Sequence, residues 1–384
     1  METSRVKVLF LASWYPSEEH PTLGNFIQKH AEAIAINNNP FVLYVCSSER
    51  VKNSKVERKT INNVDTTIVY YPKVTTKIPL LKHYLKYKRY IQSCYKGYES
   101  INEKFDLVHV NIAYPAGLFA LILKQRFNLK YVLTEQWTGY LSFKNDFKKL
   151  NRLIKWQHQK IFKQASEVVV VSESLGQSLI EKGLTNNFKV IPNVVNPDYF
   201  YPKDSEKESS VPHFIHISTF DDQHKNISGM LRVFKKFEKE KKKFKLLLVA
   251  EGDKDHVVSF INKSGVDKKK VEINMNQTAN QIGELIRRSN CLVLFSNYET
   301  FSVVLAEAWA CNVPAVYAKC GGLTELNDKD LGFQITKKNE EELYSKICLL
   351  FSSEKLNLNP SKVGSSFYPN KIAIDFDKVY RDLF

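Results

Sequence analysis

Two glutamates flank the predicted start of a short helix and define a candidate binding site. The segment Val303–Ala310 is predicted to be helical, with Ser302 as its cap, after the apolar run Cys291–Phe295 and a polar turn. Glu299 precedes this helix, and Glu307 lies within it, roughly 7–8 Å further along the axis. Free N–H groups at a helix start bind phosphate, and carboxylates accept hydrogen bonds from hydroxyls. The spacing predicts a site for a nucleoside diphosphate sugar, with the ribose at Glu307 and the sugar at Glu299.

The elements that must position these residues alternate short apolar runs with longer helical stretches. Continuous apolar runs are typical of strands buried on both faces of a parallel sheet. Two sets of strands are predicted, the first being Val6–Ala12, Val42–Cys46, Leu107–Val110, Tyr131–Thr134 and Glu167–Val171, and the second Phe214–Ile217, Lys245–Val249, Val271–Ile273, Cys291–Phe295 and Ala315–Tyr317. This alternation indicates an α/β protein with two Rossmann-like sheets. Ligands of such sheets bind at the carboxyl ends of the strands, where Glu299 falls.

The length of 384 residues favours two domains, because a single core stops growing below that size. A proline-containing segment, Ile191–Pro197, and the polar stretch Tyr201–Val211 mark the connection between them. We expect an N-terminal Rossmann-like acceptor-binding domain over residues 1–197 and a C-terminal Rossmann-like donor-binding domain over residues 198–365. A helix over residues 366–384 is expected to return to the N-terminal domain.

The composition is that of an ordinary globular enzyme, with 43% hydrophobic and 25% charged residues. The first apolar run, Val8–Ala12, is too short for a signal peptide, and no run reaches the roughly 18 uncharged apolar residues of a membrane span. We therefore expect a cytoplasmic protein. Six cysteines without CxxC spacing predict neither a disulfide nor a zinc site.

The net charge of +15 predicts an anionic partner, and two basic segments indicate which one. Lys77–Lys96 and Lys144–Lys163 interleave basic residues with leucine and aromatic residues. This pattern is typical of helices that rest on an anionic membrane surface, although a solvated helix face with core-facing aromatics is the alternative. A nucleic-acid-binding protein is a further alternative, but the sequence contains no helix-turn-helix, RRM or zinc-finger pattern.

The two glutamates also form part of an ordered set of motifs. The stretch from Glu299 to Glu307 resembles the Glu-x7-Glu signature of glycosyltransferase family 4, a retaining family with the GT-B fold. Gly321–Glu325 is similar to the family's Gly-Gly-x-x-Glu segment, Ile191–Val195 to its interdomain Pro-Asn motif, and Val171–Ser174 to its strand-end serine. The resemblance implies two Rossmann-like domains facing each other across a cleft, and transfer of a sugar from a nucleotide donor to an acceptor hydroxyl.

The resemblance also implies a donor-diphosphate lysine, which Lys225 matches within Ser218–Asn226. The family's arginine is absent, because Thr219 or Phe220 stands near its place. A surface-loop lysine is the alternative. The expected donor-binding residues are Gly24, Lys225, Asn226, Glu251, Gly252, Glu299, Phe301, Ser302, Val303 and Glu307.

Five positions of the first half resemble further family motifs. Gly24 looks like the glycine that lets backbone approach the donor phosphate, with a plain turn glycine as the alternative. His109 and Asn111 stand in an Asp-x-x-His-x-His motif, where the resemblance implies a catalytic His109 and an acceptor-binding Asn111; a buried, satisfied histidine is equally compatible with the pattern. Glu135 and Trp137 match an acceptor-cleft loop, or only pack that loop.

The implied chemistry is retaining front-face displacement, with Glu299, Lys225 and His109 as the catalytic candidates. Asp221 and Asp222 are adjacent rather than spaced as in an Asp-x-Asp anchor for a diphosphate-bound metal, so we expect no metal and no other cofactor. A lipid-linked glycan of bacterial surface polysaccharide is the expected acceptor, at the inner face of the plasma membrane. A sugar-nucleotide epimerase, a phosphorylase or a catalytically silent relative are compatible with the same fold.

Overall fold

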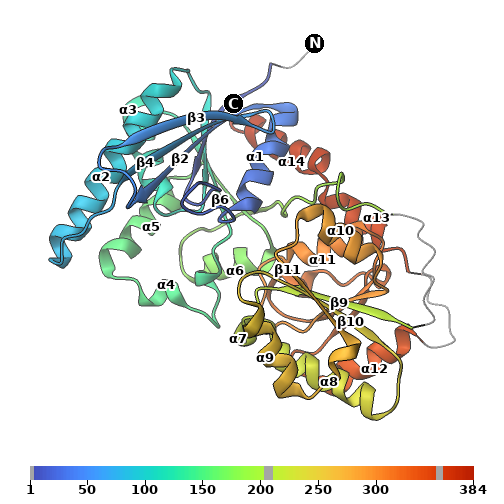
Figure 1. The fold of residues 1–384 in the computed structure, drawn as a ribbon. Helices are drawn as coiled ribbons and strands as arrows, with labels where there is room; N and C mark the ends of the chain where they lie inside the picture. The colour runs from blue at the N-terminus through green and yellow to red at the C-terminus, as the bar shows by residue number, and fades with distance from the viewer. Residues whose placement is uncertain (1–3, 203–210, 352–357) are drawn as a thin grey trace. The chain divides into compact units, whose positions relative to one another are not determined.

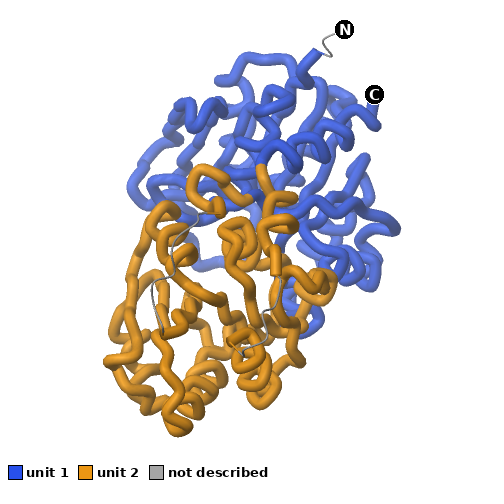
Figure 2. The backbone as a smooth tube through the Cα atoms, turned by 90° about the vertical axis from the view of Figure 1, so that its right-hand side faces the viewer, with its two compact units in different colours: residues 1–194, 369–384 blue, residues 195–368 orange. Residues whose placement is uncertain are grey.

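The chain is divided into two compact units, of which the first combines two separate stretches of the sequence. The structure, a computed structural model, describes residues 4–202, 211–351 and 358–384. Unit 1 comprises residues 1–194 and 369–384, and unit 2 comprises residues 195–368 (Figure 2). The sequence-based boundaries lie at 197/198 and 365/366. The polar connection predicted at Tyr201–Val211 falls largely outside the described residues.

An eight-stranded sheet forms the centre of unit 1, in the order β3-β4-β2-β1-β5-β6-β7-β8 (Figure 1). Its strands are β1 (Lys7–Ala12), β2 (Asn39–Ser48), β3 (Lys55–Ile61), β4 (Val64–Pro72), β5 (Leu107–Asn111), β6 (Tyr131–Glu135), β7 (Glu167–Val170) and β8 (Lys189–Val190). Its helices are α1 (Asn25–Asn37), α2 (Pro79–Ile101), α3 (Ala116–Phe127), α4 (Asp146–Lys149), α5 (Arg152–Gln164), α6 (Glu173–Glu181) and α14 (Pro369–Arg381), with a 3-10 turn η1 (Thr138–Tyr140).

Strand alternation sends the side chains of this sheet into two helical layers. Phe10 of β1 shares one core with Ile27 of α1 and Phe376 of α14. On the opposite face, α2 packs so closely that a Cβ on Gly97 would lie 2.4 Å from the side chain of Leu43. Helices therefore cover both faces, as expected for an α/β domain.

A six-stranded sheet forms the centre of unit 2, in the order β11-β10-β9-β12-β13-β14, with every pair parallel. Its strands are β9 (His213–Ser218), β10 (Lys245–Ala250), β11 (Val271–Met275), β12 (Cys291–Leu294), β13 (Ala315–Ala318) and β14 (Gly332–Ile335). Its helices are α7 (Asp222–Lys225), α8 (Ile227–Lys239), α9 (Lys254–Ser264), α10 (Ala279–Arg287), α11 (Val303–Ala310), α12 (Glu340–Leu350) and α13 (Pro360–Gly364). The 3-10 turns are η2 (Lys268–Lys270), η3 (Gly321–Glu325), η4 (Lys329–Leu331) and η5 (Ser365–Phe367).

All ten predicted strands are present, and both sheets have the predicted α/β class. Four strands were missed, namely β3, β4, β8 and β14. Strand β3 pairs antiparallel with β4, so the prediction of a purely parallel sheet is wrong at this edge. The sequence of β3, KVERKTI, is mostly exposed and charged, and an edge strand of this kind has no apolar run to reveal it.

The described helices include none that combines the length and the apolar character needed to cross a membrane. All six cysteines are described, and none is paired in a disulfide.

Candidate functional site

Three neighbouring strands of unit 2 end at one edge of the sheet and supply the loops of the candidate site. β9 leads into α7, which ends at Lys225; β12 leads into the loop that carries Glu299; and β13 leads into η3. Because β9, β12 and β13 are adjacent and parallel, their carboxyl ends lie side by side. This is the edge at which ligands of open α/β sheets bind.

Lys225 and Glu299 form a largely buried ion pair at this edge. The Lys225 Nζ lies 2.6 Å from the Glu299 Oε1, and the side chains are 14% and 7% exposed. The Ser296 hydroxyl donates a hydrogen bond of 2.8 Å to the same oxygen. The carboxylate therefore fixes the position of the ammonium, which keeps further N–H donors for an anion.

His224, which the sequence analysis did not single out, adjoins this pair. Its ring stacks on Tyr298 at a centroid distance of 4.1 Å and an interplanar angle of 7°. Its Nε2 lies 3.8 Å from the Glu299 Oε2 and has no hydrogen-bond partner among the described residues. Burial, and then the Lys225 charge, lower the pKa of His224, so the ring is mainly neutral near neutral pH. No local sequence signal could have indicated this stack.

The 3-10 turn η3, which follows β13, contacts the backbone of Glu299. Gly322 N donates a hydrogen bond of 3.1 Å to the Glu299 carbonyl. Gly321 has φ +52°, and a Cβ there would lie 1.9 Å from the same carbonyl oxygen. A glycine is therefore required at position 321 by the close approach of the two backbones.

The Gly321→Ala variant should lose about 2–5 kcal/mol of unfolding free energy, because left-handed strain of about 1–2 kcal/mol adds to an overpacking penalty of about 1–3 kcal/mol. Urea denaturation of the full chain measures this loss. Gly265→Ala is the matched control, because Gly265 has φ +68° but its nearest contact would be 3.8 Å away. Equal losses in the two variants would contradict the proposed backbone clash.

The helix predicted after Glu299 is present as α11, with the predicted bounds Val303–Ala310. The prediction that Ser302 caps it is wrong: Ser302 has φ 66° and its side chain makes no cap hydrogen bond. Its left-handed backbone directs the hydroxyl away from the first-turn N–H groups, so they have no side-chain cap. Glu307 is buried on α11.

Phe301 was predicted to bind the donor, but its side chain points into the core of unit 2. It is 4% exposed and packs edge-on against Phe367 at 5.3 Å. Only its backbone can contribute to a donor site. Ser302 and Val303, by contrast, are half-buried.

The remaining donor candidates of unit 2 also follow strands at this edge. Asn226 has φ 51° and connects α7 to α8. Glu251 and Gly252 are exposed directly after β10, and Gly252 N donates 3.1 Å to the Asn276 side chain. These three residues therefore share the sheet edge with Lys225.

Asp221 and Asp222 are occupied by the protein itself. Asp221 caps α7, and Asp222 accepts hydrogen bonds from the Ser228 N–H and hydroxyl, both of 2.8 Å. In the described part of the chain, no group of three or more metal-ligating side chains converges. The expectation that no metal is needed remains a prediction.

Gly24 in unit 1 occupies a position that only glycine fits. Its φ is +77°, and a Cβ would lie 2.7 Å from the backbone of Trp14 and 2.9 Å from the Tyr15 nitrogen. The glycine thus closes the loop between β1 and α1 tightly. Its contact with a donor phosphate remains a prediction.

His109 was predicted to be catalytic, but the structure gives it a structural place. The ring is fully buried, and its two nitrogens pair with the Tyr380 hydroxyl at 2.6 Å and the Thr134 hydroxyl at 2.7 Å. Burial holds the pKa of His109 well below its usual range. A ring with both nitrogens occupied and no exposed surface cannot face a reacting sugar, so the buried, satisfied histidine is the better interpretation.

Asn111 lies two residues further along β5, where the strand ends. It is fully buried, and neither its amide nitrogen nor its amide oxygen has a hydrogen-bond partner among the described residues. An unsatisfied buried amide costs about 1–3 kcal/mol. This feature is consistent with a residue that binds a ligand hydroxyl.

Glu135 is fully buried and organises two loops rather than facing a cleft. It accepts hydrogen bonds from the N–H groups of Ala113 (3.0 Å), Gln136 (2.8 Å) and Trp137 (2.8 Å). Burial raises the pKa of this carboxyl, and the three N–H donors oppose that effect. Its predicted role in acceptor binding is therefore replaced by loop packing. Trp137, half-buried against Tyr140 at 4.9 Å, keeps an accessible part.

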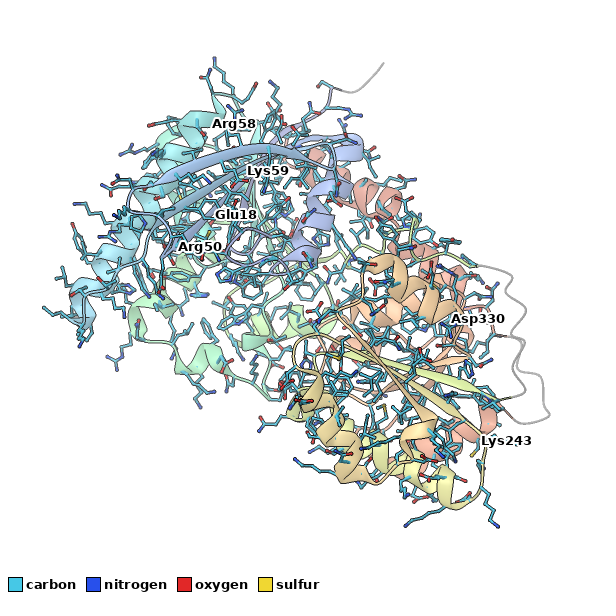
Figure 3. The ribbon with its side chains drawn as sticks, in the orientation of Figure 1. Glu18, Arg50, Arg58, Lys59, Lys243 and Asp330 are labelled. Carbon is cyan, nitrogen blue, oxygen red and sulfur yellow. The ribbon has the colours of Figure 1, made fainter. Side chains whose placement is uncertain are left out.

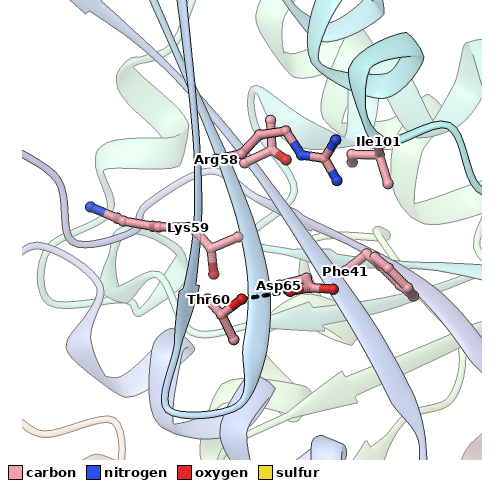
Figure 4. A pocket seen from close by; sticks show the side chains of 8 residues that line it. Phe41, Arg58, Lys59, Thr60, Asp65 and Ile101 are labelled. Atoms are coloured by element: carbon pink, nitrogen blue, oxygen red, sulfur yellow. Dashed lines mark hydrogen bonds between the residues drawn. The ribbon is translucent and has the colours of Figure 1, made fainter.

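A separate small cavity of about 170 Å³ lies at the β3–β4 edge of unit 1 (Figure 4). Arg58, Lys59 and Asp65 contribute to its wall, and the Thr60 hydroxyl donates 2.9 Å to Asp65. None of the predicted site residues lines it.

Family comparisons match nearly the whole chain in two parts. Residues 41–199 match the model described as Glycosyltransferase Family 4, and residues 200–366 match the model described as Glycosyl transferases group 1.

Three curated relatives carry glycosyltransferase or synthase names. An uncharacterized glycosyltransferase of Methanocaldococcus jannaschii is 23% identical, covering 96% of this chain and 97% of the relative. N-acetyl-alpha-D-glucosaminyl L-malate synthase of Bacillus anthracis is 26% identical, covering 73% and 76%. N,N'-diacetylbacillosaminyl-diphospho-undecaprenol alpha-1,3-N-acetylgalactosaminyltransferase of Campylobacter jejuni is 35% identical, covering 26% and 28%.

Solved structures share the fold over the full length. Sucrose-phosphate synthase from Thermosynechococcus elongatus superposes with a TM-score of 0.75 at 17% identity, covering 99% of both chains. Anabaena HepE in complex with UDP-glucose gives a TM-score of 0.68 at 17% identity, covering 98% of this chain and 100% of HepE.

Proposed function

The chain belongs to glycosyltransferase family 4 and has the GT-B fold, and from this premise we propose that it transfers a sugar, with retention, from a nucleotide donor bound at the carboxyl edge of the unit 2 sheet. The observation that carries the proposal is the buried ion pair between Lys225 and Glu299 beside the start of α11. A fixed ammonium and the N–H groups of a helix start together suit a diphosphate.

The donor is proposed to lie along α11. Lys225 and the first-turn N–H groups neutralise the diphosphate, Glu307 accepts hydrogen bonds from the ribose hydroxyls, and Glu299 accepts from the donor sugar. HepE, which shares the fold, is a UDP-glucose complex, and this supports a nucleotide-sugar donor.

The reaction is proposed to proceed by front-face displacement. The bond between the anomeric carbon and the diphosphate oxygen breaks, the acceptor oxygen bonds to the same face, and the acceptor proton passes to the departing phosphate. Lys225 stabilises the charge that develops on the leaving group. No step uses His109, whose nitrogens are occupied.

The family's arginine is absent, and we assign its charge to His224. The ring adjoins Lys225 and carries an unpartnered Nε2. A bound diphosphate would favour the protonated ring, because an adjacent anion raises the pKa of a histidine. The ring would thereby supply a second positive charge only when the donor is present.

The proposed acceptor is a lipid-linked glycan of a surface polysaccharide, used at the cytoplasmic face of a membrane. The Campylobacter jejuni relative, whose name contains diphospho-undecaprenol, supports a lipid-linked acceptor. With a radiolabelled donor and a membrane extract, label should appear in the lipid fraction. If the label appears on added L-malate, the reaction named for the Bacillus anthracis relative is favoured. If the donor sugar is converted to another sugar without transfer, an epimerase is favoured.

Donor binding should raise the melting temperature of the protein in a screen of UDP-, GDP- and dTDP-sugars, because ligand at about 100 times its Kd adds about 2.7 kcal/mol to stability. Glu307→Ala should weaken binding of the nucleotide-sugar that raises the melting temperature by roughly 10–100-fold. The reason is that a hydrogen bond to a charged group contributes about 1.5–3 kcal/mol. Glu284→Ala, which removes an exposed carboxylate of α10, is the control. An unchanged shift in the Glu307 variant would count against the proposed donor site.

A further inference from the structure

The first half of α2 projects from unit 1 with no buried residue. All the buried residues of this helix, from Tyr90 to Ile101, lie in its second half. The first half carries Leu80, which is 86% exposed, and Tyr84, which is 57% exposed. Helical turns of this kind are marginally stable in water without a packing partner, so this segment is expected to rest on something else.

The beginning of α5 extends the same surface. Leu153 and Trp156 are 49% and 54% exposed. A groove of about 730 Å³ lies between the two helices and is lined by Leu80, Tyr84 and Leu153, among others. The apolar side chains of α2 and α5 therefore form one continuous surface, which we call the α2–α5 surface.

Basic residues surround these apolar groups. Residues 77–96 contain six lysines and arginines and no acidic residue. Lys82, Lys86 and Lys88 are exposed, and within residues 4–202, 211–351 and 358–384 they have no ion-pair partner. The adjoining helix α5 adds Arg152 at its start and Lys160 in its second half.

We propose that the α2–α5 surface docks on an anionic phospholipid bilayer. Leucine, tyrosine and tryptophan are the side chains that favour the boundary between headgroups and acyl chains, and flanking lysines bind the anionic headgroups. A second copy of this chain, with its net charge of +15, would bring two positive rims together. A protein partner would also cover apolar groups, and failure to bind anionic vesicles would indicate it. The α2–α5 surface contains none of the proposed donor-site residues.

Flotation of the full chain with unilamellar vesicles tests the proposal. The protein should float with an equimolar mixture of phosphatidylcholine and phosphatidylglycerol, but not with phosphatidylcholine alone. Binding should weaken when salt is raised from about 0.1 M to 1 M, because the Debye length falls from about 10 Å to about 3 Å. The variant Lys82→Glu/Lys86→Glu should bind at least about 25-fold more weakly, since removal of each lysine costs about fivefold and each new glutamate adds repulsion. Leu80→Ser and Trp156→Ser should each lower the affinity for these vesicles by about tenfold.

Two matched variants control for overall charge and hydrophobicity. Lys268→Glu/Lys269→Glu makes the same charge change on η2 of unit 2, and Ile374→Ser removes an apolar side chain of α14 that is 56% exposed. Both should float like the wild type. The proposal is overturned if the control variants lose as much vesicle binding as the surface variants, or if the protein does not bind anionic vesicles. It is also overturned if sedimentation reveals a dimer that Leu80→Ser dissociates. The nucleotide-sugar melting shift should persist in every surface variant, so failure of docking and failure of the donor site remain distinguishable.

Discussion

Replacement of Lys225 by alanine should lower kcat/KM for sugar transfer by about 10²–10³-fold, the usual effect of deleting one preorganised group that stabilises transition-state charge. The ammonium is held 2.6 Å from Glu299, so it is already in place before the leaving diphosphate develops its charge. The loss should fall mainly on kcat, since this charge is greatest in the transition state. Steady-state kinetics with a radiolabelled donor measure it.

Lys243→Ala is the matched control for this variant. Lys243, labelled in Figure 3, is exposed and lies two residues before β10 at the amino edge of the sheet, whereas Lys225 ends α7 at the carboxyl edge. Its replacement should leave kcat/KM unchanged. His224→Gln should lower kcat/KM by about tenfold. It should also abolish any increase in rate that the wild type shows on mild acidification. Equal losses in the Lys225 and Lys243 variants would contradict the assigned site.

The protein should lose stability steeply in acid, by about 2–3 kcal/mol between pH 6.5 and about 4 from His30, with a further loss from His109. Burial lowers the pKa of His30 to about 4 and that of His109 well below its usual range. Above pH 6.5 neither the folded nor the unfolded state protonates these rings. Below pH 6.5, the two histidines become protonated in the unfolded chain but stay neutral in the folded one. The free energy of unfolding therefore falls with pH until the pH reaches the pKa of the histidines in the folded state. Urea titrations at a series of pH values measure the slope.

His109→Gln should flatten that slope by up to about 1.4 kcal/mol per pH unit, although it also destabilises the protein at neutral pH. The slope is the informative quantity, because mere loss of packing would lower stability equally at every pH. His20→Gln, which removes an exposed histidine, should leave the slope as it is. A His109 variant with the wild-type slope would contradict the assignment of a neutral, buried ring.

The parts of the fold that the sequence predicts are those whose signal is local. The buried parallel strands are continuous apolar runs, and α11 was placed residue for residue. Strand β3 is mostly charged and lies at an exposed edge, so the search for apolar runs could not detect its hairpin with β4.

Within the candidate site, the sequence indicated which residues lie close together, but not which hydrogen-bond partners each side chain has. Lys225 and Glu299, 74 positions apart, are in contact because both follow adjacent strands, which topology alone makes predictable. His109 was misassigned because its partner Tyr380 lies 271 positions away. Glu135 was misassigned for a similar reason, since the N–H group of Ala113 comes from a different loop. Spacing within a motif contains no information about such remote partners.

Because α14 packs on α1, the order of synthesis differs from the order of assembly. Phe376 and Tyr380 complete the core that contains Phe10, yet the ribosome makes them only after the whole of residues 195–368 has been translated. Unit 2 can therefore close while unit 1 still lacks its last helix, and the nascent chain must keep an apolar face of unit 1 uncovered until then. A truncated product ending before Pro369 should consequently be a preferred client of chaperones and proteases.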